Sequence, residues 1–163
     1  MRAIAVVGVL LAAGIAHADL DLANKHKDAD AKLAEEVSRT DAKCGTKLAA
    51  TYDWASEKSA PGDPPARGAE ECAAVVQGIR QICTDVEGGK DAVAKKVKAV
   101  TCKYNAKVSA KKSKGKGVAT DLAGSPAVPH TWLEFTKSTL HVEYDWFSAN
   151  TASETDAYLR KQL

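Results

Sequence analysis

The chain has 163 residues, 27% of them charged and 6% aromatic, and its formal net charge at pH 7 is only +2. A charge balance this near to zero argues against nucleic acid as a partner and against a membrane-surface protein. The length is sufficient for one domain with its own hydrophobic core.

Residues 1–18 have the pattern of a cleavable signal peptide. Arg2 is followed by an apolar run over residues 3–15 and by Ala16-His17-Ala18, the kind of small-residue site that signal peptidase requires. The run is shorter than the ~20 apolar residues that span a bilayer, which argues against an uncleaved anchor. We therefore expect a single mature domain over residues 19–163, without a transmembrane segment, in the periplasm or outside the cell.

The first expected element of the mature chain is a helix over residues 28–43, where Leu33 and Val37 stand four positions apart. The polar residues 19–27 before it are expected to be loose.

Residues 47–54 fit either a continuation of this helix or a strand. A short repeat, called the echo below, favours the strand: the motif L-x-x-x-Y-D-W-x-S at residues 48–56 recurs at residues 140–148. The second copy alternates apolar and polar residues and is rich in strand formers.

The remaining elements follow from apolar periodicity and from the positions of glycine and proline. Apolar residues at helical spacing predict a central helix over residues 69–86, after a proline-rich loop over 59–68. The other expected elements are a helix over 91–98, a strand over 99–104, a hairpin of strands 131–136 and 139–146 turning at Lys137-Ser138, and a helix over 154–162. This order, α-β-α-α-β-β-β-α, predicts an α+β domain with a small, mainly antiparallel sheet of about four strands packed with helices.

Residues 105–129 are rich in Lys, Ser, Gly and Pro and are expected to form a long, mobile basic loop. Between Ala92 and Thr120 the chain has nine lysines and no acidic residue. Two interpretations stay open: the loop binds an anionic polymer, or it is a solvated connector. The candidate contacts for such a polymer are Lys103, Lys107, Lys111, Lys112, Lys114 and Lys116.

All four cysteines (Cys44, Cys72, Cys83, Cys102) lie after the signal segment. An even number of cysteines in an exported chain points to two disulfides, whereas no close C-x-x-C pair indicates a metal site.

Two connectivities remain possible geometrically. Cys72 and Cys83 stand eleven positions apart on the central helix, and at ~1.5 Å rise per residue they are about 16 Å apart, too far to pair. Cys44–Cys83 with Cys72–Cys102 is favoured, because the helix should return antiparallel to the first strand and bring Cys83 beside Cys44. Cys44–Cys72 with Cys83–Cys102 is the alternative.

One run of features extends over about residues 70–160. It consists of a cysteine-bounded helix (Cys72-x(10)-Cys83), the turn Gly89-Lys90, the strand Val100-x-Cys102, and a late strand over residues 140–145. In this it resembles small exported, disulfide-containing bacterial proteins of unknown function. The resemblance implies an α+β fold and carries over no activity.

The sequence marks no catalytic residue, cofactor or metal. The motifs G-x-S-x-G and H-E-x-x-H and the P-loop are absent, and His26, His130 and His141 lack metal-ligand spacing. Disulfide-bonded cysteines supply no thiol nucleophile.

Three tryptophans, Trp54, Trp132 and Trp146, lie on or beside the expected strands. They fill the core, or they form an aromatic platform for a ligand. Together these features predict an exported, non-enzymatic binding or interaction module of unknown ligand. The alternative is a small periplasmic hydrolase whose site has no sequence motif.

Overall fold

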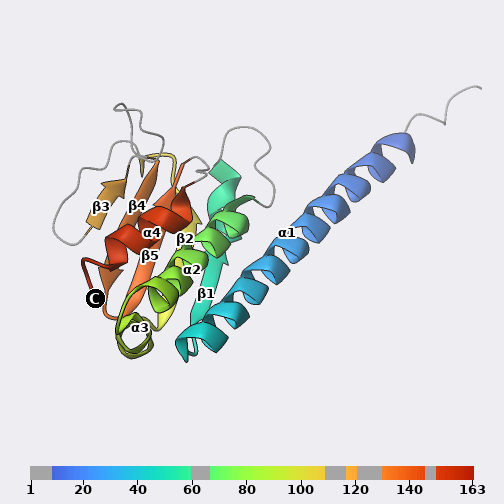
Figure 1. Cartoon of the computed structure of the whole chain (residues 1–163). Helices are drawn as coiled ribbons and strands as arrows, with labels where there is room; N and C mark the ends of the chain where they lie inside the picture. Colours follow the sequence, from blue (N-terminus) through green and yellow to red (C-terminus); the bar gives the residue numbers. More distant parts are fainter. Residues whose placement is uncertain (1–8, 60–66, 109–116, 121–129, 146–149) are drawn as a thin grey trace, which may run out of the picture.

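The computed structural model describes residues 9–59, 67–108, 117–120, 130–145 and 150–163. Figure 1 shows the arrangement of the elements. In chain order they are α1 (Val9–Cys44), β1 (Ala49–Asp53), the short 3-10 helix η1 (Trp54–Ser59), α2 (Arg67–Asp85), α3 (Gly89–Lys96), β2 (Ala99–Tyr104), β3 (Gly117–Thr120), β4 (Thr131–Thr136), β5 (Thr139–Tyr144) and α4 (Thr151–Leu159).

The five strands form one mixed sheet in the order β1-β2-β5-β4-β3. β2 is parallel to both β1 and β5, and β4 is antiparallel to both β5 and β3. The prediction of a mainly antiparallel sheet is therefore wrong, although the α+β class is correct. Helices α2 and α3 return the chain to the end of the sheet where β1 started, so β2 must run parallel to β1. The hairpin then places β5, rather than β4, beside β2.

Two segments expected to be irregular are regular. Residues 19–27 belong to α1, where Lys25 and Asp21 form an ion pair of 2.8 Å one helical turn apart. Residues 117–120, inside the expected basic loop, form β3 and pair with β4. Val118 and Thr120 are residue types that favour strands. They pair there with Leu133 and Thr131 of β4. The rest of that loop, 109–116 and 121–129, lies outside the described residues.

The helices lie on one face of the sheet (Figure 1). α2 contacts β1 and β2, and α1 and α4 pack against α2. The strand register places Tyr52, Cys102, Val142 and Leu133 in one row on this covered face, where all four are buried. Side chains alternate along a strand, so the residues between them project from the opposite face. No described helix covers that face, which is called the open face below.

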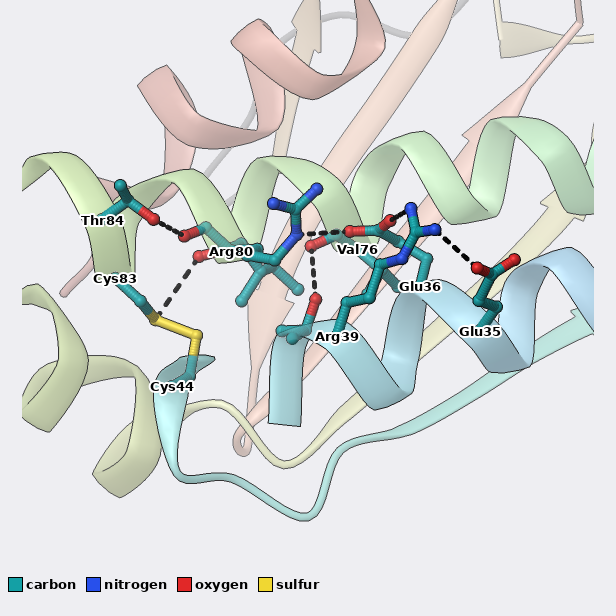
Figure 2. Close-up of polar contacts among 10 residues, drawn as sticks. Glu35, Glu36, Arg39, Cys44, Val76, Arg80, Cys83 and Thr84 are labelled. Atoms are coloured by element: carbon teal, nitrogen blue, oxygen red, sulfur yellow. Dashed lines mark hydrogen bonds and ion pairs between the residues drawn. A yellow bond between two sulfur atoms is a disulfide. The ribbon is translucent and has the colours of Figure 1, made fainter. Parts of the chain in front are cut away.

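Both expected disulfides are present. Cys44 pairs with Cys83 at a Cα separation of 5.4 Å, and Cys72 pairs with Cys102 at 5.9 Å. This confirms the favoured connectivity. The first bridge joins the end of α2 to the end of α1 (Figure 2), and the second joins the start of α2 to β2. The central helix is therefore covalently fixed at both ends to its neighbours.

The β4–β5 turn is formed by two residues with left-handed backbone, Lys137 at φ 49° and Ser138 at φ 66°. Such two-residue turns match the twist of a hairpin but are most often Asn-Gly, because other side chains crowd the backbone there. The Ser138 carbonyl oxygen accepts hydrogen bonds from the backbone N–H groups of Lys98 (2.8 Å) and Ala99 (3.2 Å). The turn thus also positions the start of β2.

Replacing Lys137→Asn together with Ser138→Gly should raise the free energy of unfolding by about 1 kcal/mol, because both new residues tolerate the left-handed region better. Urea denaturation measures the change. Lys161→Asn, at an exposed lysine outside the turn, is the control and should leave stability unchanged. Equal or lower stability of the double variant would show that the native turn is not strained.

Candidate ligand-binding surface

The open face carries two rows of side chains across the strands, all of them polar except the buried Trp132. The register aligns Thr51, Thr101, His141 and Glu134 in one row. The next row consists of Asp53, Lys103, Glu143 and Trp132. Each row takes one residue from each of β1, β2, β5 and β4, so the surface exists only when the sheet is assembled.

A shallow groove of about 440 Å³ lies over this face. Its lining comes from four strands, β1, β2, β5 and β4. Its lining residues are Thr51, Tyr52, Asp53, Thr101, Cys102, Lys103, Glu134, His141, Val142 and Glu143.

Hydrogen bonds fix several of the groove side chains. Thr101 Oγ1 lies 2.8 Å from His141 Nδ1, which joins β2 to β5 above the sheet. Lys103 Nζ lies 3.3 Å from Glu143 Oε1, and Asn105 Nδ2 donates to the other oxygen of that carboxylate. The centre of the groove is therefore preorganised, which lowers the entropic cost of binding.

The groove has an excess of negative charge. Three carboxylates, Asp53, Glu134 and Glu143, share the lining with one lysine, Lys103. Glu143 is already neutralised by Lys103, whereas Asp53 and Glu134 lie on the two outer strands of the groove, β1 and β4. This arrangement suits a ligand that carries hydroxyl groups at its centre and a cationic group toward either end.

A second polar pair lies at the end of β5. His130 Nδ1 is 2.7 Å from Asp145 Oδ1, and the backbone N–H of Asp145 donates to the carbonyl of His130. The Asp145 side chain is nearly buried, at 13% exposure, whereas that of His130 is 42% exposed. The sequence does not reveal this pair, because the two residues are fifteen positions apart and match no motif.

The candidate polymer-binding lysines are not all in one place. Lys103 belongs to the groove and is paired with Glu143. Lys107 is exposed and lies just after the end of β2, where its backbone N–H donates to Asn105 Oδ1. The helix α3 precedes the opposite end of β2. Lys111, Lys112, Lys114 and Lys116 lie outside the described residues.

The tryptophans do not form one described platform. Trp54 lies in η1, where its ring stacks on His26 at 3.8 Å and its Nε1 donates to Asp30 Oδ1. It thereby attaches the middle of α1 to the end of β1. Trp132 lies on β4 and is only 8% exposed. Trp146 is outside the described residues.

A buried polar cluster lies on the covered face near the start of α2. Tyr52 Oη donates to Glu57 Oε1 at 2.6 Å, and the Tyr52 and Tyr144 rings stack at 6.1 Å. Burial raises the pKa of both tyrosines, and it also raises the pKa of the Glu57 carboxyl. Gly68 is required here, because a Cβ would lie 2.1 Å from Tyr144 Oη.

The raised pKa of Glu57 predicts a pH dependence. The folded state holds a proton on this carboxyl more strongly than the unfolded state, so the stabilisation is present below the ordinary value of 4.5 and is lost as pH rises through the higher folded value. Glu57→Gln should remove this loss while keeping an acceptor for Tyr52. Urea denaturation in buffers on both sides of the ordinary value measures it. Glu35→Gln, on the exposed side of α1, is the control. A pH profile of stability for Glu57→Gln that is identical to the wild-type profile would contradict the prediction.

Among the described residues, no group of three or more His, Cys, Asp or Glu side chains is arranged to hold a metal ion. In the same part of the chain, no helix combines the length and the apolarity needed to cross a membrane. Comparison with protein-family profiles, with curated proteins and with solved structures finds no match to this chain.

Proposed function

We propose that this chain is an exported, non-enzymatic binding module whose ligand occupies the groove on the open face. The observation that carries the proposal is the asymmetry of the sheet. Its covered face holds the apolar core and the Cys72–Cys102 bridge, whereas its open face presents a polar groove with fixed hydrogen-bonding groups. Concave surfaces with a few convergent polar groups are the usual binding sites of proteins.

Export is supported by two independent features. The segment before Asp19 has the charge, apolar run and small residues of a signal peptide. The two disulfides are of the kind that oxidising compartments form and maintain. Intact-mass analysis of the periplasmic or secreted protein should find a chain that begins at Asp19, and a product that retains Arg2 would contradict cleavage.

The chemistry of the groove favours a hydroxyl-bearing ligand with amino groups. Asp53 and Glu134 supply carboxylates on the outer strands of the groove, β1 and β4, and hydroxyl groups come from Thr51 on β1 and Thr101 on β2. Hydrogen bonds to a charged partner are about twice as strong as neutral ones. An amino-sugar oligomer therefore serves as the probe, with its N-acetylated counterpart as the uncharged match.

The test is calorimetric titration of glucosamine trimer and of N-acetylglucosamine trimer. We expect the amine form to bind more tightly, and we expect Asp53→Asn with Glu134→Gln to weaken it at least about a hundredfold, since two charge-assisted contacts of about 1.5–3 kcal/mol each are lost. The control is Asp28→Asn with Glu87→Gln, which removes the same charge from exposed positions elsewhere. Equal affinity of the two double variants would refute the groove as the site.

The second candidate is a hydrolase, and the His130–Asp145 pair is the observation that favours it. A histidine whose Nδ1 is held by a carboxylate can accept a proton from water at Nε2. If this is the function, recovered trimers will be shortened and His130→Gln will abolish the cleavage. The binding proposal requires that the trimers be recovered intact by mass spectrometry.

A further inference from the structure

Six lysines lie at one end of the sheet, where the parallel strands β1, β2 and β5 begin and where α3 packs (lower part of Figure 1). All six are exposed. They are Lys47, Lys90, Lys95, Lys96, Lys98 and Lys137, and this set is called the lysine edge.

Main-chain hydrogen bonds bring three of these lysines together. The Ala49 N–H donates to the carbonyl of Lys98 (3.1 Å), and the Lys98 N–H donates to the carbonyl of Ser138 (2.8 Å). Lys47, Lys98 and Lys137 therefore lie just before the three adjacent strands β1, β2 and β5. Neighbouring strands are spaced by about 4.8 Å, so the three backbones form a row across this end of the sheet.

Helix α3 adds the other three lysines beside this row. A Cβ at Gly45 would lie 3.5 Å from Cε of Lys90, so the Lys90 side chain reaches the turn that precedes Lys47. Lys95 and Lys96 lie in the last turn of α3, where a positive charge also favours the helix dipole. That dipole accounts for two of the six lysines and not for the other four.

The lysine edge differs from the other basic positions in its pairing. Within the part of the chain that the structure describes, none of the six forms an ion pair with a carboxylate side chain, whereas Lys25, Lys32 and Lys103 do. The ammonium group of Lys98 donates to the backbone carbonyl of Ala94, whereas that of Lys96 donates to the main-chain oxygen of Leu163, the last residue of the chain. The exposed carboxylates near α3, which are Asp85, Glu87 and Asp91, are fewer than the six lysines. The edge is thus a concentration of positive charge on a chain whose total charge is close to zero.

Lys137 provides a second indication. It occupies a left-handed turn position that favours asparagine or glycine. The side chain is exposed and makes no described contact that would stabilise the turn. A lysine at a turn position that is unfavourable for its backbone, with its side chain exposed beside other lysines, is typical of a binding surface.

We propose that the lysine edge binds a linear anionic polymer, at a site separate from the groove. Three of the lysines precede adjacent strands in a row, and a row of positive charges suits a linear polymer better than the broad plane of a membrane surface. The repeating negative charges of a sulfated or phosphorylated glycan are of this kind.

The experiment is heparin binding at a series of salt concentrations. Lys47→Gln, Lys98→Gln and Lys137→Gln together should weaken binding at low salt at least tenfold and flatten the dependence of log affinity on log salt by about 2, because each neutralised charge releases roughly 0.7–0.9 counterion. The matched control is Lys25→Gln, Lys27→Gln and Lys58→Gln, which removes three exposed lysines from other parts of the surface. It should retain most of the affinity and the salt slope. Circular dichroism of both variants checks that they are folded.

Two further arms decide the alternatives. Replacing Lys111, Lys112, Lys114 and Lys116 by Gln tests the basic loop, and loss of heparin binding in that variant but not in the edge variant would overturn the proposal. Sedimentation with vesicles of phosphatidylglycerol tests a membrane, and binding to vesicles without binding to heparin would also overturn it. Neither arm depends on the groove, so the outcomes of the two proposals are distinguishable.

Discussion

Removal of the Cys72–Cys102 bridge, by Cys72→Ala with Cys102→Ala, should lower the free energy of unfolding by about 2–5 kcal/mol, the usual cost in a small exported domain. Both cysteines are buried, at 0% and 3% exposure, and Cys102 lies on β2 between the two other parallel strands. Loss of the bridge releases the start of α2 from the sheet and leaves two small voids in the core. Urea denaturation, with the unfolding slope compared between variants, measures the loss.

The control for this prediction is the thiol content of the protein. Titration under denaturing conditions should find no free thiol before reduction and four after it, because all four cysteines are paired. The wild type after reduction should be destabilised at least as much as the double variant, since it loses both bridges. A double variant as stable as the oxidised wild type would show that the bridge does not constrain the fold.

Gly78→Ala should lower the free energy of unfolding by about 1–3 kcal/mol, the usual cost of overpacking. A Cβ at Gly78 would lie 2.3 Å from the carbonyl oxygen of Ala152 and 2.8 Å from Cβ of Thr155, both on α4. Because the nearest atom is backbone, α4 must move as a whole. In an exposed helix the same substitution stabilises by about 0.5–1 kcal/mol, so the sign of the change is diagnostic.

The matched control for Gly78→Ala is Gln77→Ala, at the exposed neighbouring position on α2. That substitution should leave stability nearly unchanged. The comparison is made by thermal and urea denaturation of both variants. An increase in stability for Gly78→Ala would mean that α2 and α4 are not in close contact.

Local patterns predicted the parts of the fold that depend on local sequence. The apolar stripe of α2 and the separation of Cys72 and Cys83 along it were sufficient to favour the observed disulfides. The echo at residues 48–56 and 140–148 correctly identified β1 as a strand. In the structure the two copies flank β2 on either side, and their tyrosines stack on the covered face.

The order and orientation of the strands could not be predicted from the sequence. The two copies of the echo give the same alternation whether β5 pairs parallel or antiparallel with β2, because the side-chain period is two in both cases. Only the long-range pairing of β2 with β5 decides between them. The hairpin β4–β5 suggested an antiparallel sheet, and it is indeed antiparallel, but it occupies one half of the sheet only.

The candidate site could not be predicted from the sequence either, because it too depends on long-range strand pairing. Thr51, Thr101, His141 and Glu134 come from four strands, and no spacing in the sequence relates them. The most prominent feature of the sequence was instead the group of lysines between residues 92 and 120. In the structure, the described members of this group lie at different places. Lys95, Lys96 and Lys98 lie on the lysine edge, whereas Lys103 lies in the groove beside Glu143.

The central claim is that the open face of the sheet is the binding surface. Its most direct test is amide chemical-shift mapping of the folded protein during titration with glucosamine trimer. The proposal predicts saturable shifts at Thr51, Thr101, His141 and Glu134, with the amides of α2 unchanged. Saturable shifts confined to the helices, or no saturable shift at the four groove residues, would contradict it.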